Sequence, residues 1–117
     1  MKNTTLGHQY KDGDVIIRQG EEGNSLYVIQ EGKVGIYHEN GGDEIKIAEL
    51  GPSEFFGEMG LFDKDVRSAT VRSMGESKIL TIDRKNFYKT IQRDPSLAYR
   101  LLEKMSKRLR DTNKMIK

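Results

Sequence analysis

The sequence predicts a mainly β fold, in the form of a sandwich, barrel or jelly roll, with α-helices at its C-terminal end. Three observations support this prediction. Short apolar runs recur along the first 83 residues, turn-forming residues separate them, and the apolar period becomes helical after Asp83. Strands spaced at roughly 8–12 residues with such turns are typical of these β folds. A length of 117 residues fits one domain, so we expect a single domain over 1–117.

The candidate strands are rich in Val, Ile and Tyr, which suit a pleated and half-buried surface. They are the runs Val15–Ile17, Leu26–Ile29, Val34–Tyr37, Ile45–Leu50, Thr70–Val71 and Ile79–Ile82. The segments between them hold Gly, Asn, Asp and Pro, which either tolerate a positive φ or fix their own φ. These turns are Lys11–Asp14, Gln19–Asn24, Glu31–Gly32, Asn40–Asp43, Gly51–Ser53 and Gly75–Glu76. The β part is therefore expected over about residues 10–83.

The remaining residues, about 84–116, have the apolar spacing of two helices. Phe87, Tyr88 and Ile91 predict a short first helix. Asp94 and Pro95 then supply an N-cap and a first-turn proline, which are the expected start of a second helix. Its predicted apolar face contains Leu97, Leu101, Leu102, Met105 and Leu109.

Charge divides the chain at the same boundary. Residues 1–83 carry 9 Lys and Arg against 15 Asp and Glu, whereas residues 84–117 carry 11 against 3. A basic segment is typical either of contact with nucleic acid or another acidic surface, or of an ordinary solvated helix. We favour the solvated helix and do not expect direct nucleic-acid binding.

Composition excludes several classes of protein. No apolar run reaches the length of a membrane span and no leader-like segment opens the sequence. The absence of cysteine removes disulfides, thiol nucleophiles and cysteine-ligated zinc, and it fits a reducing compartment. We therefore expect a cytoplasmic protein that neither spans nor binds a membrane.

Two short signals suggest chemistry but have simpler explanations. Gly41-Gly42-Asp43-Glu44 resembles the signature of diguanylate cyclases, yet it lies between two short strands, where a hairpin loop explains it. His8 and His38 have no partners at metal-ligand spacing. No nucleophile elbow or P-loop motif is present. We expect no catalytic residues, no metal and no cofactor, and hence no enzyme.

The most informative stretch runs from Phe55 to Phe62 and is followed by Arg67. It places two glycines around Glu58, so the backbone can approach a ligand closely and point N–H groups toward it. The planar fork of Arg67 could face the same ligand from the next strand. Such a set suits a molecule with both a hydroxyl and a phosphate. A structural ion pair between Glu58 and Arg67 explains these residues equally well.

This stretch resembles the phosphate-binding cassette of cyclic nucleotide-binding domains. That cassette reads Phe-Gly-Glu-(Leu/Met)-(Ala/Gly)-Leu, then a short gap and Arg-x-Ala-x-Val, and it matches Phe56–Leu61 and Arg67–Val71. Upstream segments match the family's successive turns and strands as well. They are Gly13–Ile16, Gln19–Glu21, Tyr27–Ile29 and Gly32–Val34. The likeness covers about residues 10–115 and is strongest to the sensor domains of bacterial catabolite activator proteins.

The resemblance implies a double-stranded β-helix, the cyclic nucleotide-binding β-roll, with a C-terminal helix pair. It also implies roles for individual residues. Arg67 would pair with the cyclic phosphate, and Glu58 would accept the ribose 2′-hydroxyl. Apolar side chains would line the base pocket, and residues of the last helix would reach the purine. The implied ligand-binding set is Gly57, Glu58, Met59, Gly60, Arg67, Ser68, Ala69, Ile36, Ile47, Thr112 and Asn113.

The sequence departs from the family pattern at three places. Asn113 replaces the usual serine of a Thr-Ser pair, which weakens the assignment of Thr112 and Asn113. Ser53-Glu54 replaces a Gly-Asp pair before the cassette. Ser68 follows the arginine where alanine often accompanies cAMP and threonine often accompanies cGMP. Serine occurs in cAMP-responsive activators, so we expect cAMP, with cGMP as the alternative ligand.

The resemblance predicts a regulatory sensor in signal transduction, with no output domain within these 117 residues. The effector would be another protein or a missing domain, and the C-terminal helix could pair with its twin in a homodimer. The alternative is a degenerate roll that binds no nucleotide and acts as a structural or protein-interaction domain.

Overall fold

The computed structural model describes residues 7–57 and 65–116, with the side chains of Asp65, Arg108, Leu109 and 112–116 left undescribed. The chain divides into two compact units, Met1–Arg84 and Lys85–Lys117. The first contains the strands and the second nearly all of the helical residues. The predicted mainly β fold with a C-terminal helix pair is therefore confirmed.

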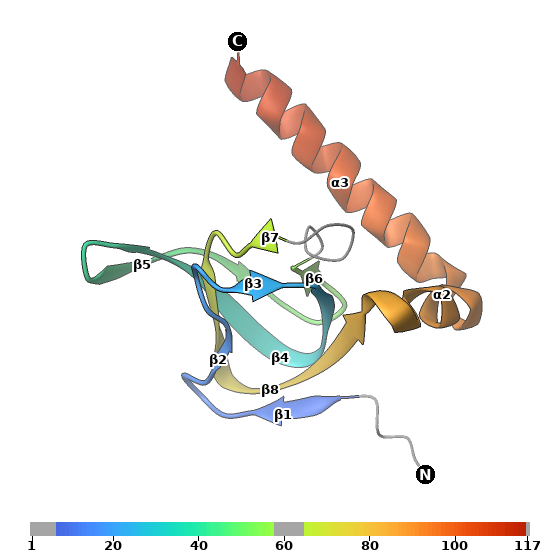
Figure 1. Ribbon diagram of the computed structural model, residues 1–117, viewed down its shortest axis with the longest axis horizontal. Helices are drawn as coiled ribbons and strands as arrows, with labels where there is room; N and C mark the ends of the chain where they lie inside the picture. Colours follow the sequence, from blue (N-terminus) through green and yellow to red (C-terminus); the bar gives the residue numbers. More distant parts are fainter. Residues whose placement is uncertain (1–6, 58–64, 117) are drawn as a thin grey trace. The chain divides into compact units, whose positions relative to one another are not determined.

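An antiparallel six-stranded sheet forms the first unit (Figure 1). Its strand order is β1-β8-β4-β5, and two further strands pair with the long ones, β2 with β8 and β6 with β4. The strands are β1 His8–Tyr10, β2 Val15–Ile17, β4 Ser25–Asn40, β5 Asp43–Leu50, β6 Phe55–Phe56 and β8 Thr70–Asp83. A separate two-stranded sheet pairs β3 Glu22–Gly23 with β7 Asp65–Val66.

Two predicted turns lie inside long strands instead of ending them. Glu31–Gly32 is a bulge within β4, where the register with β8 shifts on both sides of Glu31. Gly75 similarly lies within β8, although its φ is 74°. Backbone hydrogen bonds between β4 and β8 continue across these irregularities, because a bulge can absorb an extra residue without ending the pair. Four predicted strands therefore become two.

The predicted hairpin at Asn40–Asp43 is confirmed. Asn40 and Asp43 are paired in register, and Gly41 and Gly42 between them have φ values of 64° and 93°. Positive φ at both central residues defines the type I′ turn, which suits the twist of paired strands.

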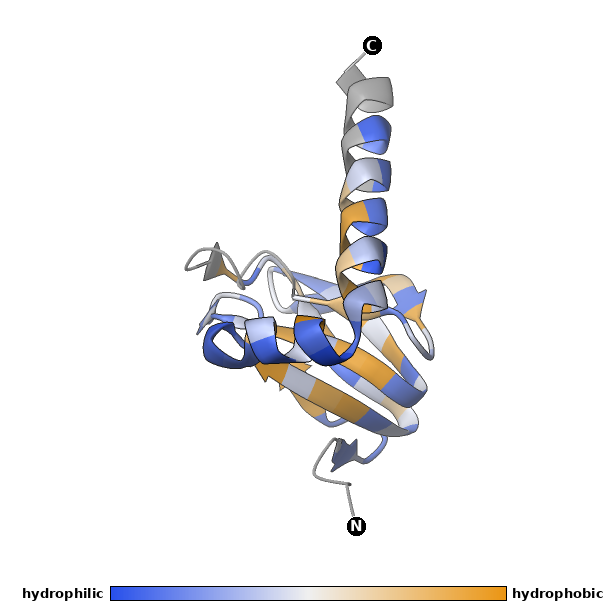
Figure 2. Cartoon of the chain, turned by 90° about the vertical axis from the view of Figure 1, so that its right-hand side faces the viewer, coloured by the Kyte–Doolittle hydropathy of each residue, from blue (hydrophilic) through white to orange (hydrophobic). Residues whose placement is uncertain are grey.

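The core of the sheet unit is apolar and made by alternate residues of several strands. It contains Ile17, Ile29, Val34, Phe56, Val71 and Ile79, all of them buried. Figure 2 shows hydrophobic residues concentrated on the strands of this sheet. Burial of such side chains is the dominant favourable contribution to folding.

Ser53 has a φ of 69° in the turn that precedes β6. Its N–H donates to the Ile29 carbonyl at 2.8 Å, which fixes the turn against β4. This left-handed conformation strains residues other than glycine. A glycine, as in the family pattern that the sequence resembles, would avoid this strain.

The helices of the second unit are α2, Arg84–Arg93, and α3, Pro95–Ile116. Pro95 is the first residue of α3, as predicted. The Asp94 carboxylate accepts a hydrogen bond from the Ser96 hydroxyl, and the Asp94 carbonyl accepts one from the Leu97 N–H at 3.0 Å.

The predicted apolar face of α3 is wrong at one residue. Leu97 and Leu101 are buried, but Leu102 is 66% exposed. Adjacent helical positions point about 100° apart at 3.6 residues per turn, so Leu102 cannot share the direction of Leu101. Within the described residues no helix is long and apolar enough to cross a bilayer.

Candidate functional site

Arg67 is the centre of the candidate site, and its backbone is fixed by the chain that precedes β4. The Arg67 N–H donates to the Glu21 carbonyl at 2.8 Å, and the Arg67 carbonyl accepts from the Gly20 N–H at 2.9 Å. These bonds extend the pairing of β3 with β7. The start of the Arg67 side chain is therefore held by a turn far away in the sequence.

The guanidinium of Arg67 is bound to two backbone carbonyls. Nη1 donates to the Gly57 carbonyl and Nη2 donates to the Ser25 carbonyl, each at 3.0 Å. Gly57 follows β6 and Ser25 begins β4. Because these strands pair through Tyr27 and Phe56, the sheet itself places the two carbonyls.

Arg67 is 7% exposed, although its side chain carries a permanent charge. Within residues 7–57 and 65–116, no carboxylate forms an ion pair with it. These carbonyl oxygens satisfy N–H donors but carry no net charge, so they do not neutralise the guanidinium. A buried cation with neutral partners is a chemically suitable anchor for an anion.

Gly57 is the one predicted cassette glycine within the described part. Its φ is 78°, and a Cβ atom there would lie 3.2 Å from Arg67 Nη1 and 3.0 Å from the Ser25 carbonyl oxygen. Both the backbone conformation and the close approach of Arg67 thus favour glycine. The neighbouring rings of Tyr27 and Phe56 stack with centroids 5.1 Å apart.

The other predicted site residues are distributed as follows. Ser68 is exposed and Ala69 half-buried, directly after Arg67 and before β8. Ile36 on β4 is partly buried and packs against the core, whereas Ile47 on β5 is 60% exposed. Ile47 is the extra residue of a bulge in β5, between Ala48, which pairs with Ile36, and Lys46, which pairs with Tyr37.

The surroundings of five predicted site residues are not described. Glu58, Met59 and Gly60 lie outside the described residues, so neither the ribose contact of Glu58 nor its ion pair with Arg67 is tested. Thr112 and Asn113 belong to α3, but their side chains are outside the described part. Hence Gly57, Arg67, Ser68 and Ala69 are the predicted ligand-binding residues of the cassette whose surroundings the structure describes.

Sequence reasoning missed Gly23 and Ser25 as parts of the site. Ser25 contributes a backbone carbonyl, which any residue could supply, so its identity carries no signal. Gly23 was assigned only to the turn Gln19–Asn24, and its proximity to Arg67 depends on the pairing of β3 with β7.

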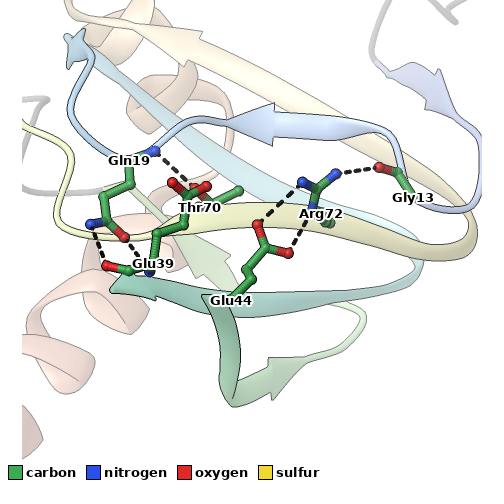
Figure 3. Close-up of polar contacts among 6 residues, drawn as sticks. All are labelled: Gly13, Gln19, Glu39, Glu44, Thr70 and Arg72. Atoms are coloured by element: carbon green, nitrogen blue, oxygen red, sulfur yellow. Dashed lines mark hydrogen bonds and ion pairs between the residues drawn. The ribbon is translucent and has the colours of Figure 1, made fainter. Parts of the chain in front are cut away.

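A second arginine, Arg72 on β8, lies in a different kind of polar network (Figure 3). Its Nε and Nη2 donate to the two carboxylate oxygens of Glu44 at 2.9 and 3.2 Å, and Nη1 donates to the Gly13 carbonyl at 3.0 Å. Hydrogen bonds from Arg72 lower the pKa of Glu44, and those to Glu44 raise the pKa of Arg72.

The same network continues to the turn before β3. The Gln19 side chain pairs with the backbone of Glu39, accepting from its N–H at 2.8 Å and donating to its carbonyl at 3.2 Å. The Gln19 N–H donates to the Thr70 hydroxyl at 3.0 Å. Figure 3 shows these contacts joining β4, β8 and the turn after β2. Within the described residues, no cluster of three or more His, Cys, Asp or Glu could hold a metal ion.

Comparison with known proteins gives a family match over most of the chain. Residues 7–94 match the profile described as the cyclic nucleotide-binding domain. The chain is 36% identical over 105 residues to the cyclic AMP receptor protein of Thermus thermophilus, covering 89% of this chain and 49% of that protein. It is 43% identical over 82 residues to the cAMP-dependent protein kinase regulatory subunit of Dictyostelium discoideum, covering 67% and 25%.

A solved structure agrees with these sequence matches. The Thermus thermophilus catabolite activator protein superposes with a TM-score of 0.78 at 34% identity, covering 93% of this chain and 53% of that one. The predicted β-roll is therefore confirmed. The chain spans about half the length of the Thermus protein and about a quarter of the Dictyostelium protein.

Proposed function

The chain belongs to the cyclic nucleotide-binding domain family, and from this we propose that it is a regulatory module that binds cAMP. The observation that supports binding most strongly is Arg67, a buried guanidinium whose described partners are the neutral carbonyls of Gly57 and Ser25. A cyclic phosphate would supply the missing negative charge. The phosphate oxygens would accept hydrogen bonds from the guanidinium N–H groups that are not bonded to the two carbonyls.

The remaining cassette would complete the contacts of the sugar and phosphate. Backbone N–H groups at Gly57, Glu58, Gly60 and Ser68 would add donors to the phosphate, with Met59 and Ala69 beside them. Glu58 would accept the ribose 2′-hydroxyl. A carboxylate near a phosphate is repulsive unless it faces the sugar, so its contribution would be to orient the ligand.

The purine would be bound by less specific contacts. Ile47 exposes 60% of its surface on β5, which leaves an apolar side chain available to a base, and Ile36 would contribute from the same bulge. Thr112 or Asn113 would supply a polar contact to the purine from α3.

The preference for cAMP is supported by the names of two relatives, a cyclic AMP receptor protein and a cAMP-dependent kinase regulatory subunit. Ser68 is exposed, so its hydroxyl is free to contact a ligand, and cGMP is the competing choice. Alanine at this position would remove that hydroxyl.

The output of the module would lie elsewhere. Because the chain covers about half of the Thermus receptor, we propose that an effector protein or a further domain reads the bound state, and that α3 can pair with its twin in a homodimer. We also propose that the protein is cytoplasmic and is not an enzyme. It would contact neither a membrane nor nucleic acid.

Calorimetric titration of the purified chain with cAMP and with cGMP tests the proposal directly. Saturable 1:1 binding of cAMP, tighter than that of cGMP, is the expected result. Binding of cGMP but not of cAMP would still support a cyclic-nucleotide receptor, with cGMP as its ligand. No heat and no change in melting temperature with either nucleotide would favour the degenerate roll that acts in structure or protein interaction.

A further inference from the structure

Gly23, the last residue of β3, lies against the side chain of Arg67. A Cβ atom built on Gly23 would be 2.6 Å from Arg67 Cζ and still nearer to its Nε and Nη2. Real Cβ atoms do not approach other heavy atoms so closely, so a side chain at position 23 and this placement of the guanidinium exclude one another.

The backbone does not explain the glycine at this position. Gly57 and several turn glycines have positive φ, but Gly23 is not among them. Residue 23 is also paired in a regular antiparallel register with Asp65. An alanine could adopt this conformation without backbone strain, so the space that Arg67 occupies is the reason for glycine.

Arg67 cannot move aside without losing hydrogen bonds. Its backbone is bonded to Gly20 and Glu21, and its guanidinium is bonded to the carbonyls of Ser25 and Gly57. Both ends of the side chain are therefore fixed. A methyl group on residue 23 would remove the guanidinium from at least one carbonyl, because it would overlap the Nη2 that bonds Ser25.

We propose that Gly23 is a positioning residue for nucleotide binding, and this inference rests on the proposed function. The missing side chain at position 23 lets Arg67 keep both carbonyl bonds. Those bonds fix the plane of the guanidinium. Its remaining N–H groups then point in one fixed direction, in which they would bind the phosphate. A preorganised fork loses less conformational entropy on binding than a free one.

The decisive variant is Gly23→Ala, with Gly51→Ala as its matched control. Gly51 also lacks a positive φ, and the nearest atom to a Cβ there is Glu54 Oε1 at 3.9 Å. We expect Gly23→Ala to weaken cAMP binding by about tenfold, the order of one hydrogen bond to a charged group. Gly51→Ala should stay within about twofold of wild type, and both variants should remain folded by circular dichroism.

A double-mutant cycle separates positioning from a general structural effect. In an Arg67→Lys background there is no guanidinium to displace, so Gly23→Ala should cause little further loss of cAMP affinity. Equal losses in both backgrounds, or cAMP affinity of Gly23→Ala equal to that of Gly51→Ala, would overturn the inference. Loss of binding in Arg67→Ala together with normal binding in Gly23→Ala would overturn it and leave the proposed function intact.

Nuclear magnetic resonance gives a result even if Gly23→Ala folds poorly. The Arg67 Nε–H signal of the wild-type protein, identified by its loss in Arg67→Ala, should be protected from solvent exchange because the guanidinium is held. The same signal should exchange fast in a folded Gly23→Ala protein. An Arg67 signal that already exchanges at the rate of the exposed arginines in the wild type would contradict the inference.

Discussion

Arg67 and Arg72 lie close together in the sequence, yet their surroundings differ in charge. Arg72 donates twice to the Glu44 carboxylate and once to a carbonyl. Arg67 donates to two carbonyls, and within the described residues no carboxylate pairs with it. Glu44 therefore supplies a counter-ion for Arg72, whereas both described partners of the Arg67 guanidinium are neutral.

Burial makes this difference consequential. The Arg72 and Glu44 side chains are 30% and 27% exposed, so solvent screens their attraction and the pair has a modest effect on stability. Arg67 is almost fully buried, and a buried charge that lacks a counter-ion is costly to keep. Under the proposed function the cyclic phosphate would be the counter-ion of Arg67, whereas Arg72 already has Glu44.

Replacing each arginine by alanine should separate these roles most strongly. Loss of one member of a buried charge pair costs about 2–5 kcal/mol, so Arg67→Ala should weaken cAMP binding by roughly 30- to 4,000-fold. Arg72→Ala should leave the affinity within a few fold and reduce stability instead. Titration calorimetry and thermal melting of both variants check this, and similar affinities for the two would remove the contrast.

Arg67→Lys refines the same comparison. A lysine keeps the charge but presents a point-like ammonium instead of a planar fork. It cannot bind two carbonyls and a phosphate with the same geometry, so it should restore only part of the affinity lost in Arg67→Ala. Full recovery by lysine in the same titration would show that charge alone is sufficient.

Glu58 tests whether the contrast is complete, because an ion pair with Arg67 would make the two arginines alike. If Glu58 binds the ribose, Glu58→Gln should weaken cAMP binding by roughly 5- to 30-fold, near the loss of a hydrogen bond to a charged group. The 2′-deoxy analogue of cAMP should bind the wild type weakly and lose nothing more in the variant. Equal losses with both nucleotides would mean that Glu58 does not contact the ribose, and the ion pair with Arg67 would be the remaining explanation that the sequence offered.

A smaller effect is expected from the end of α3. If Thr112 or Asn113 contacts the purine, truncation after Arg108 should weaken binding by about tenfold or less, the value of one polar contact. Hydrogen exchange at residues 106–115 should also slow when nucleotide is added, since a ligand favours the state that it contacts. If hydrogen exchange is unchanged by nucleotide and the truncated protein binds cAMP with full affinity, then the end of α3 does not contribute to the binding site.

The smallest effect concerns acid stability near Arg72. The pKa of Glu44 is lowered, chiefly by hydrogen bonds from Arg72. A carboxylate whose folded pKa is lowered contributes stability above its unfolded pKa, about 4.3, and loses it as the pH falls through the folded pKa. Acid unfolding of Glu44→Gln should therefore be less steep below about pH 4.3 than that of the wild type. Identical unfolding curves would mean that the pair of Arg72 and Glu44 does not contribute to stability in acid.

Much of the fold could be predicted from local patterns. The hairpin loop was predicted from the two glycines after Asn40, and the start of α3 was predicted from Asp94 and Pro95; the turn type required the φ values of Gly41 and Gly42. The short strands β1, β3, β6 and β7 were missed, because β1 is the polar run His8–Tyr10 and the other three have two residues each, which carry no period. The turns at Gly32 and Gly75 were predicted as strand ends, because sequence does not show that pairing between β4 and β8 continues past them.

Site residues that act through a distinctive residue type could be predicted from the sequence. Contacts made through the backbone could not. Arg67 and Gly57 were expected from the cassette pattern. The carbonyl of Ser25 has no sequence signal, and the closeness of Gly23 to Arg67 depends on a pairing between distant segments. The spatial relation of Ile36 and Ile47 required the bulge between β4 and β5, which no local pattern predicted.

The most direct test of an anion site at Arg67 compares cAMP with adenosine, which lacks the phosphate. Both ligands are titrated into the wild type and into Arg67→Ala, and circular dichroism verifies the fold. The account predicts that the wild type prefers cAMP strongly, and that Arg67→Ala binds cAMP no better than it binds adenosine. Undiminished preference for cAMP in folded Arg67→Ala would contradict the claim that Arg67 holds the phosphate.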